Sequence, residues 1–321
     1  MDLADISRPV REDLAAVEEG LKSVGKVSSP GLSELLGYTL KGGGKRARPI
    51  LALLCGRLCG APGERVVPMA VAAELTHLAT LVHDDTIDKS PVRWSRPTPN
   101  TLWGEEQAVL LGDYLFARAG ELTASTDNLR VIKLLPETLM IITGGEIAQS
   151  RSAFQLDQTR AQYLQRVSSK TAALFTLATA SGAILAGARE EWVQALSAYG
   201  HNFGIAFQIV DDILDFIGTE EEMGKPVGSD LAHGTLTLPA MLLMEQYPQD
   251  NPVTKLFRER GGAEYVRQAV ELVRGSSIID QCFDVAAEYR DQACLGLQGL
   301  PDNEYRQSLY DLADFIITRR K

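Results

Sequence analysis

The sequence predicts an all-α protein, folded as a single-domain bundle of helices. Three observations support this. Apolar residues recur with the spacing of helix faces through nearly the whole chain. There is no run of alternating β-branched residues that would indicate a strand. No low-complexity linker divides the chain, so residues 1–321 are expected to form one domain.

The expected helices follow one another with short polar turns between them. A start signal precedes residue 30, where Ser-Ser-Pro leads into an apolar segment, since proline is favoured in the first turn. Segments 46–60 and 64–86 carry apolar residues all round, which indicates buried central helices. The predicted helices cover residues 9–24, 30–40, 46–60, 64–86, 105–124, 130–150, 158–186 and 190–217, and the chain from Leu238 onward.

Two long loops interrupt these helices. Around residues 89–100 the sequence SPVRWSRPTPN contains three prolines, which predicts a loop. The second loop, GTEEEMGKPVGSDLAHGTLT, covers residues 218–237. Each loop directly follows a short acidic motif.

The overall composition excludes several classes of protein. A net charge of −10 argues against a general nucleic-acid binder, which needs a basic face or tail. The four cysteines lack the spacing of a zinc site or a disulfide framework. No apolar run approaches the roughly 18 residues of a membrane span, and the N-terminus lacks the apolar stretch of a signal peptide. We therefore expect no nucleic-acid partner, no transmembrane segment and a cytoplasmic location.

The two acidic motifs, DDTID at residues 84–88 and DDILD at residues 211–215, share one spacing. On a helix this spacing puts the first and last carboxylates one turn apart on one face. A single copy is commonly a solvated acidic patch at a helix end. Two copies in apolar segments favour a bound cation, because like charges repel and a carboxylate among apolar residues is costly unless it is neutralised.

The ligand chemistry favours a hard divalent cation. Carboxylate oxygens suit Mg²⁺ or Ca²⁺, and Mg²⁺ usually combines one or two carboxylates with substrate phosphates. If the two helices face one another, the carboxylates converge on the mouth of an apolar cavity. A ligand with a diphosphate head and a hydrocarbon tail fits both the cations and the apolar wall.

Three basic segments could bind such an anion. Residues 41–49, KGGGKRARP, form a glycine-rich turn that opens a helix. Backbone amides at a helix N-terminus and nearby guanidinium groups bind anions, although such a segment can also be a solvated turn. The loop after the first acidic motif carries Arg93 and Arg96, and Lys170-Thr171 interrupts an apolar helix.

Together and in this order, these segments resemble the trans-isoprenyl diphosphate synthase (polyprenyl synthetase) family. GGGKRARP resembles the family's GGKRxRP, HLATLVHDDTID its first aspartate-rich motif, and SSKTAALF its KT segment. FGIAFQIVDDILDF resembles the second aspartate-rich motif, and GKPVGSDLAHGTLTLP the loop behind it. The resemblance runs from about residue 30 to the C-terminus, and five ordered motifs make it specific.

The resemblance implies antiparallel helices around a central apolar cavity (the isoprenoid synthase type of fold), usually as a homodimer. It implies a reaction in which an allylic prenyl diphosphate is condensed with isopentenyl diphosphate to give a longer all-trans polyprenyl diphosphate. Catalytic roles are implied for all six motif aspartates and for Lys170. The implied ligands of three Mg²⁺ ions are Asp84, Asp85, Asp88, Asp211 and Asp215, with Asp212 close by.

The resemblance also divides the basic residues between two substrates. Contacts to the allylic diphosphate are implied for Arg93, Lys170, Gln208 and Lys225, with Thr171 beside Lys170. The isopentenyl diphosphate site is implied to contain Lys45, Arg48 and His77. His77 could instead be a structural histidine bonded to a backbone carbonyl.

Two departures from the family pattern leave other functions open. Arg93-Trp94-Ser95 stands where the family usually has RRG. In the family the second arginine contacts isopentenyl diphosphate, so Trp94 removes one charge-assisted hydrogen bond, worth ~1.5–3 kcal/mol. Thr235 stands where the family often has lysine. One alternative is a terpene-synthase-like lyase that ionises a prenyl diphosphate without elongating it. The other is a non-catalytic subunit of a heteromeric synthase, against which the six retained aspartates count.

Product length is expected to depend on the depth of the cavity below the first motif. Ala79 lies five residues before Asp84, where short-chain members of the family tend to carry an aromatic residue. Alanine leaves room, which favours geranylgeranyl length or longer, although Ala79 could instead only permit close helix packing. A floor could also come from a neighbouring helix, through Leu111, Tyr114, Leu115 or Phe116.

Overall fold

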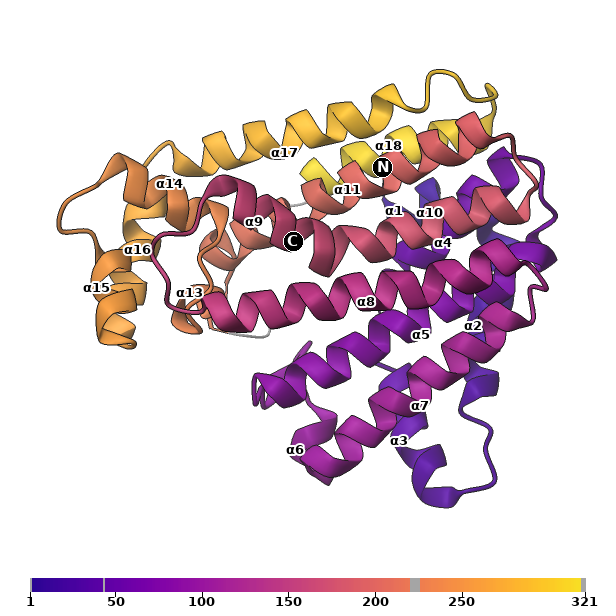
Figure 1. Cartoon of the computed structure of the whole chain (residues 1–321), viewed down its shortest axis with the longest axis horizontal. Coiled ribbons are helices and arrows are strands. Elements are labelled where there is room, and N and C mark those ends of the chain that lie inside the picture. Colours follow the sequence, from indigo (N-terminus) through magenta and orange to yellow (C-terminus); the bar gives the residue numbers. More distant parts are fainter. Residues whose placement is uncertain (1, 43, 220–225, 319–321) are drawn as a thin grey trace. The chain divides into compact units, whose positions relative to one another are not determined.

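The computed structural model is built almost entirely of helices and describes residues 2–42, 44–219 and 226–318 (Figure 1). This confirms the predicted all-α class. Contacts divide the chain into two compact units. Unit 1 comprises Met1–Thr138, Leu174–Gly200 and Cys294–Leu312, and unit 2 comprises Leu139–Ala173, His201–Ala293 and Ala313–Lys321. The expectation of one domain over residues 1–321 stays a prediction.

Unit 1 carries the first acidic motif and the glycine-rich turn. Its elements are α1 (Leu3–Ile6), η1 (Arg8–Val10), α2 (Arg11–Val24), α3 (Pro30–Leu40), α4 (Ala47–Leu58), α5 (Gly63–Ile87), β1 (Val92–Arg93), β2 (Arg96–Pro97), α6 (Pro99–Trp103), α7 (Glu105–Ala124) and nearly all of α10 (Ala173–Leu185). Four helices contribute residues to both units: α8 (Leu129–Ser152), α11 (Glu190–Ile217), α17 (Ile278–Leu295) and α18 (Glu304–Thr318).

Helix α5 is the core helix of unit 1. It packs against α2, α4 and α7, and its middle residues are buried. One 18-residue window of α5 has a mean hydropathy of 1.4, which is enough for a membrane span by length and composition. However, 67% of that window is buried inside the structure. The core helix of a soluble protein passes the same test, so α5 is weak support for a membrane span.

Two glycines allow α4 and α10 to approach closely. A Cβ on Gly182 would lie 2.4 Å from the carbonyl oxygen of Ala52 and 2.9 Å from the backbone nitrogen of Gly56. A Cβ on Gly56 would lie 3.5 Å from the carbonyl oxygen of Gly182 and 2.6 Å from a methyl carbon of Val66 on α5. Neither position has room for a side chain. The close approach brings the start of α10 near the basic residues at the start of α4.

Unit 2 carries the second acidic motif and the KT segment. Its further elements are α9 (Arg160–Val167), the π-helix η2 (Ser168–Ala172), α13 (Ser229–Ala232), α14 (Leu238–Gln246), α15 (Pro252–Glu259) and α16 (Ala263–Arg274). Its hydrophobic core includes Ile213 and Phe216 from within and beside the acidic motif. The second motif is thus built into a packed helix.

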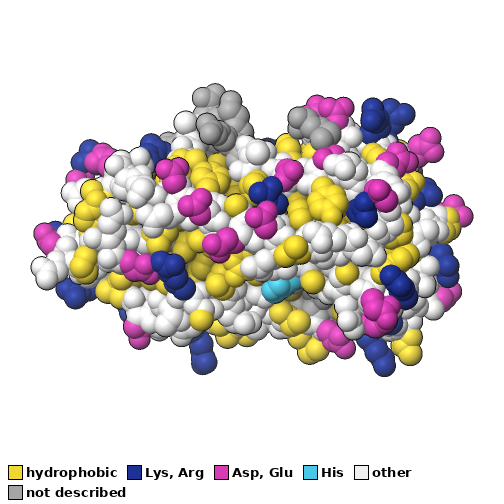
Figure 2. Space-filling view, turned by 90° about the horizontal axis from the view of Figure 1, so that it is seen from above, with side chains coloured by type: hydrophobic (Ala, Val, Ile, Leu, Met, Phe, Trp, Pro, Cys, Tyr) yellow, Lys and Arg dark blue, Asp and Glu magenta, His cyan; other side chains and the backbone are white. Residues whose placement is uncertain are grey.

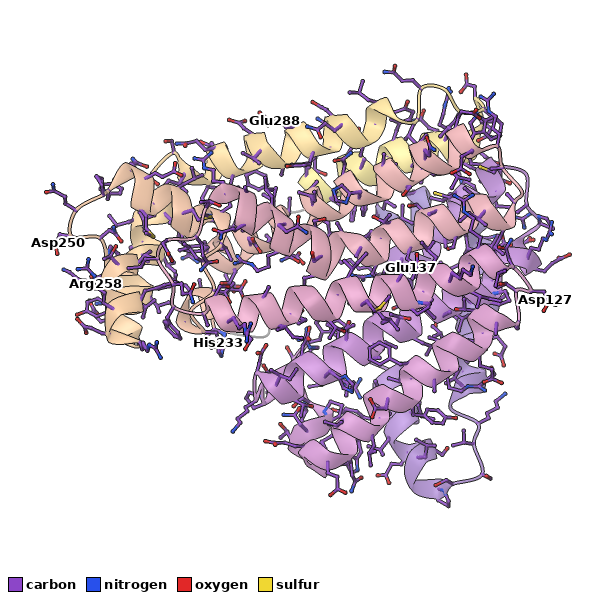
Figure 3. The ribbon with its side chains drawn as sticks, in the orientation of Figure 1. Asp127, Glu137, His233, Asp250, Arg258 and Glu288 are labelled. Carbon is purple, nitrogen blue, oxygen red and sulfur yellow. The ribbon has the colours of Figure 1, made fainter. Side chains whose placement is uncertain are left out.

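The surface carries interspersed charges. On the face drawn in Figure 2, Lys and Arg side chains lie among Asp and Glu side chains, with apolar side chains between them. Charged side chains such as Glu137 on α8 and Glu288 on α17 point away from the ribbon and are exposed (Figure 3). Charged side chains of both signs are therefore spread over this face.

Helix boundaries match the sequence prediction closely in some places. The helices predicted at 30–40, 105–124 and 190–217 have those bounds in the structure. The 89–100 region differs from the predicted loop, because it forms the short β1–β2 hairpin and the start of α6. Strands of two residues are too short to show an alternating pattern.

Candidate active site

The first acidic motif ends α5. Asp84 is half-buried and Asp88 is exposed, whereas Asp85 between them is 2% exposed. The backbone N–H of Asp88 donates to the carbonyl of Asp84 at 2.8 Å, which keeps the helical turn to the last aspartate. The three carboxylates therefore lie within one turn, as the spacing predicts.

Asp85 is held by Arg93 from the following hairpin. Nε of Arg93 donates to Oδ2 of Asp85 at 2.8 Å. Oδ1 of Asp85 is buried and accepts no hydrogen bond in the described part of the chain. Burial raises the pKa of Asp85, against the Arg93 hydrogen bond, which lowers it. A desolvated oxygen with spare acceptor capacity suits a hard cation.

The altered sequence Trp94-Ser95 forms the turn of the β1–β2 hairpin. Arg93 pairs with Arg96 across the hairpin, and the two residues between them have φ values of 50° and 59°. Two successive positive φ angles are typical of a type I′ turn, which favours asparagine and glycine. Non-glycine residues in this conformation cost on the order of 1–3 kcal/mol each. The indole of Trp94 is 45% exposed.

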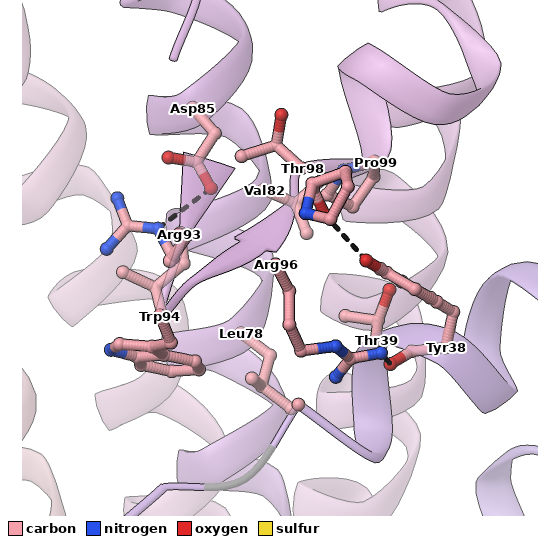
Figure 4. A pocket seen from close by; sticks show the side chains of 13 residues that line it. Tyr38, Thr39, Leu78, Val82, Asp85, Arg93, Trp94, Arg96, Thr98 and Pro99 are labelled. Atoms are coloured by element: carbon pink, nitrogen blue, oxygen red, sulfur yellow. Dashed lines mark hydrogen bonds and ion pairs between the residues drawn. The ribbon is translucent and has the colours of Figure 1, made fainter. Parts of the chain in front are cut away.

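Arg96 lies beside the glycine-rich turn. Its guanidinium is 4.1 Å from the centre of the Tyr38 ring, and Tyr38 donates from its hydroxyl to the carbonyl of Pro97 at 2.8 Å (Figure 4). A Cβ on Gly42 would lie 3.5 Å from Arg96 and 3.7 Å from the Trp94 ring. These residues line a small pocket of about 50 Å³ that also includes Asp85. Trp94 thus stands in this hairpin where the family usually has a second arginine, and Arg96 supplies a cation nearby.

The basic residues at the start of α4 have different surroundings. Lys45 is exposed, whereas Arg48 is 9% exposed and lies 4.4 Å from the centre of the Phe175 ring on α10. Such a cation–π contact fixes the direction of a guanidinium. Arg46 is turned inward toward two glutamates.

His77 lies on α5, two turns before the first motif. Desolvation lowers its pKa well below 6.5, and the positive charges of Arg48, Arg93 and Arg46 lower it further. This favours the neutral imidazole in the unliganded protein, and a neutral imidazole can donate a hydrogen bond to an anion. The structure brings together three predicted site residues here, namely Arg48, His77 and Arg93.

The second motif has a different arrangement, within unit 2. Asp212 is 3% exposed, and both of its oxygens are used by neutral donors. Tyr163 donates to Oδ2 at 2.7 Å and Gln208 donates to Oδ1 at 2.8 Å. Thr171 in turn donates to Gln208 at 2.6 Å. Burial raises the pKa of Asp212 to about 7, because it disfavours the charged form.

The outer aspartates of the second motif differ from Asp212. Asp211 is half-buried, and Asp215 is 1% exposed. Asp215 accepts from the backbone N–H of Asp230 at 3.2 Å, and its own carbonyl accepts from the N–H of Gly228 at 2.9 Å. These bonds tie the following loop to the motif.

Lys170 lies in the π-helix that joins α9 to α10. Its ammonium is 2.8 Å from Oε1 and 3.0 Å from Oε2 of Glu146 on α8. π-Helical segments frequently mark functional sites, because the extra residue changes the direction of side chains. The predicted pair Lys170 and Thr171 thus has one partner on α8 and one on α11.

The loop behind the second motif is described only in part. Lys225, a predicted contact to the allylic diphosphate, lies outside the described residues. Thr235 donates from its backbone N–H to the carbonyl of Asp230 at 2.9 Å, and this bond closes the turn after α13.

The sequence did not assign a role to four residues that pair with predicted site residues or lie beside them: Tyr163, Glu146, Arg46 and Glu74. Tyr163 lies seven residues before Lys170, a spacing that would place two residues on one face of a continuous α-helix, although Lys170 itself lies in the π-helix η2. Arg46 could not be separated from Lys45 and Arg48 within a run of basic residues. Their partners come from distant parts of the sequence, so spacing alone could not identify them.

The donor set fits a divalent metal that binds together with a phosphate. Within the described ranges, no three His, Cys, Asp or Glu side chains lie close enough together to hold a metal ion by themselves. In each motif the middle aspartate accepts hydrogen bonds from protein side chains. The atoms that the motifs offer to a metal ion are carboxylate oxygens only. Mg²⁺ usually takes one or two carboxylates and completes its shell with phosphate and water. The residues present fit that mode of binding.

Comparisons with known proteins agree with these features. The family model for polyprenyl synthetase matches residues 29–273. The heptaprenyl diphosphate synthase component 2 of Geobacillus stearothermophilus is 40% identical over 305 residues, which are 95% of each chain. An all-trans-nonaprenyl-diphosphate synthase (geranyl-diphosphate specific) of Rhodobacter capsulatus is 37% identical over 321 residues, 98% of this chain and 97% of that one.

A solved structure is also similar over the full length. The crystal structure of polyprenyl synthase from Caulobacter crescentus CB15, complexed with calcium and isoprenyl diphosphate, has a TM-score of 0.95 and 35% sequence identity. The match covers 100% of this chain and 98% of that chain.

The all-α fold and the two aspartate motifs define a prenyltransferase of the isoprenoid synthase type. The chain belongs to the polyprenyl synthetase family, and its resemblance to that family is confirmed. Members of this family use divalent metal ions, as the calcium in the Caulobacter structure illustrates.

Proposed function

We propose that this protein condenses an allylic prenyl diphosphate with isopentenyl diphosphate to give a longer all-trans polyprenyl diphosphate. The observation that carries the proposal is the pair of intact DDxxD motifs, each with a buried aspartate in an apolar helix. Each turn of the reaction releases one inorganic diphosphate and one proton. Full-length similarity to prenyl diphosphate synthases supports the same conclusion.

The product is of geranylgeranyl length or longer. The two relatives described above are named for heptaprenyl and nonaprenyl products, which favours that longer range here. Ala79 has no exposed surface, so its neighbours pack directly on it. The presence of a deep cavity below Ala79 therefore stays a proposal, and measuring the length of the product would test it.

The metal would be held by oxygens of the two motifs. We assign Asp84, Asp85, Asp88, Asp211 and Asp215 as ligands of Mg²⁺, with three ions per site. When bound, Mg²⁺ would neutralise charge on the leaving diphosphate and so favour breaking of the allylic C–O bond. Asp212 acts as a buried anchor, because both of its oxygens accept hydrogen bonds from the protein.

The first unit binds isopentenyl diphosphate. Lys45, Arg48 and His77 donate charge-assisted or neutral hydrogen bonds to its phosphate oxygens. Arg48 is held in direction by Phe175, and neutral His77 adds a donor without another positive charge. The homoallylic double bond is thereby held at a fixed position, which is the main contribution that a protein makes to such a step.

Arg93 and Lys170 bind the allylic diphosphate. Both are now paired with carboxylates, Asp85 and Glu146 respectively, and exchange them for phosphate oxygens when substrate arrives. Lys225 would add a further cation. Gln208 and Thr171 are proposed to contact the same diphosphate; in the structure Thr171 donates to Gln208 and Gln208 donates to Asp212.

The bond changes follow from this arrangement. The allylic C–O bond breaks and its electron pair leaves with the diphosphate. The double bond of isopentenyl diphosphate supplies the electrons for the new C–C bond, and the departing diphosphate accepts the proton that is then lost. Apolar helices exclude water, which would otherwise capture the allylic cation.

The test is a product assay with purified protein and Mg²⁺. Farnesyl or geranylgeranyl diphosphate is supplied with and without isopentenyl diphosphate, and the products are resolved by chromatography. Longer diphosphates that form only with isopentenyl diphosphate are expected. Hydrocarbons or alcohols formed without it would instead indicate a lyase, and no product in either case would indicate a non-catalytic subunit.

We further propose a homodimer in the cytoplasm. Leu102 on α6 and Val109 and Leu110 on α7 are exposed apolar residues, and such side chains are typical of a subunit interface. The Geobacillus relative is named as component 2, so a heteromeric assembly is the competing outcome. Light scattering on the purified chain distinguishes the two, because a heteromer would leave this chain monomeric when alone.

A further inference from the structure

Arg46 stands at the junction between the glycine-rich turn and α4. Its φ of 50° is left-handed, unlike that of the helical residues that follow. Lys45 before it and Arg48 after it belong to the proposed isopentenyl diphosphate site. The run of basic residues thus contains one member with a different backbone conformation.

The Arg46 side chain is directed into unit 1 toward two glutamates. Nη1 donates to Oε1 of Glu74 on α5 at 2.8 Å, and Nε donates to Oε1 of Glu18 on α2 at 2.6 Å. The Arg46 side chain is 10% exposed and that of Glu74 is 4% exposed. Because both charges are largely desolvated, losing Arg46 would leave the Glu74 carboxylate buried without this cation, and losing Glu74 would remove one of the two carboxylates described here beside Arg46.

The glycine-rich turn lies directly on this ion pair. Gly44 has a φ of 143°, and a Cβ there would lie 3.3 Å from Nη1 of Arg46 and 3.6 Å from Oε1 of Glu74. The backbone on the N-terminal side of Lys45 therefore rests on the Arg46–Glu74 pair. Any side chain at this position would meet the pair and an unfavourable backbone angle.

The same pair connects the turn to the helix that carries His77. Glu74 lies three residues before His77 on α5, and residues at this spacing are neighbours on a helix surface. The pair thus joins two segments of the proposed isopentenyl diphosphate site that are distant in sequence.

We propose that Arg46 and Glu74 are positioning residues for isopentenyl diphosphate. They do not touch the substrate. They fix the position of the glycine-rich turn relative to α5, so that Lys45, Arg48 and His77 can bind the same diphosphate. This inference rests on the proposed function of the site.

The main test compares Glu74→Gln with Asp13→Asn. Asp13 makes a similar pair in the same unit, accepting from Nε and Nη2 of Arg57 at 2.6 and 2.7 Å, away from the glycine-rich turn. Both variants should lower the melting temperature. Only Glu74→Gln should raise the KM for isopentenyl diphosphate, by about tenfold, while the KM for the allylic substrate changes less than twofold. An equal rise in both variants, or no rise for Glu74→Gln, would overturn the inference.

Two further measurements keep the test decisive. If Glu74→Gln does not fold, Glu18→Gln removes the negative charge of the more exposed partner of Arg46 and should raise the same KM about threefold with little change in melting temperature; an unchanged KM would count against the inference. Titration with inorganic diphosphate, by calorimetry, measures binding without turnover. If the wild-type protein elongates nothing, the proposed function fails, and a Glu74→Gln loss of diphosphate affinity that Asp13→Asn does not share still supports the positioning role.

Discussion

The two aspartate motifs share a spacing but differ in what holds the middle carboxylate. In α5, Asp85 is paired with the charged Arg93, and one of its oxygens accepts no hydrogen bond in the described chain. In α11, Asp212 accepts from the neutral donors Tyr163 and Gln208 through both oxygens. The difference predicts that the first motif would exchange partners if substrate binds there, whereas Asp212 of the second motif is held by hydrogen bonds within a packed core.

The largest expected effect comes from the outer carboxylates of either motif. Asp84→Asn and Asp211→Asn should each lower kcat by roughly 10²–10³-fold, because each removes a carboxylate that is proposed to hold the Mg²⁺ that balances the leaving diphosphate. Steady-state assays with excess Mg²⁺ measure the loss, and circular dichroism checks the fold. Near-normal turnover in either variant would show that the motif concerned does not hold the metal.

The contrast between the middle aspartates can be tested with Tyr163→Phe and Arg93→Gln. Tyr163→Phe leaves a buried oxygen of Asp212 without a donor, which should cost about 1–3 kcal/mol of unfolding free energy. Arg93 is partly exposed and the glutamine can still donate a hydrogen bond to Asp85, so Arg93→Gln should cost less stability and should instead raise the KM for the allylic substrate. Urea denaturation and kinetics on both variants provide the comparison. The reverse order of stabilities would contradict the anchored character of the second motif.

The altered hairpin beside the first motif gives a smaller effect. Trp94→Arg should restore one charge-assisted hydrogen bond to isopentenyl diphosphate, worth ~1.5–3 kcal/mol. The KM for that substrate should fall about tenfold or more, and Trp94→Phe serves as the uncharged control. An unchanged KM in Trp94→Arg would mean that Arg96 already supplies the charge.

The dependence of the unfolding free energy on pH should report on the protonation of His77, which lies two turns before the first motif. The pKa of His77 in the folded protein lies well below 6.5, so below about pH 6.5 the unfolded chain takes up a proton that folded His77 does not. The free energy of unfolding should therefore fall as the pH decreases from 7.5 to 5. His77→Gln should show a smaller fall in parallel urea titrations. Identical slopes for variant and wild type would mean that His77 is not held neutral.

The smallest expected effect concerns backbone strain in the two loops. The loop behind the second motif uses Gly228 at a φ of 72°, whereas the first hairpin uses Trp94 and Ser95 at positive φ. Ser95→Gly should stabilise the protein by about 0.5–1 kcal/mol. Gly228→Ala should destabilise it, since a Cβ there would lie 2.7 Å from Val266. Thermal melts would reveal an opposite sign for either substitution.

Helices with a proline start signal or clear apolar spacing could be predicted from the sequence. Proline in the first turn marks the start of α3 at Pro30, and the predicted bounds 30–40 are those of the structure. The position of the motif aspartates within one helical turn followed from spacing alone. In both cases the information lies in residues that are close together in the sequence, so the prediction did not depend on contacts with distant residues.

Features that depend on distant partners could not be predicted. The inward direction of Arg46 requires Glu18 and Glu74, which come from two other helices. The hydrogen bond from Tyr163 to Asp212 joins residues 49 positions apart. The β1–β2 hairpin depends on backbone angles that Trp94-Ser95 does not favour, so its turn carries none of the usual residues.

The exposed indole at the tip of that hairpin has an optical consequence. Trp94 stands over Gly42 in the glycine-rich turn, close to where the second diphosphate is proposed to bind. Tryptophan emission responds to the polarity and charge of its surroundings. Trp94, in place of the family's second arginine, thus puts an intrinsic fluorophore beside the proposed substrate site, and its emission should change when substrate binds.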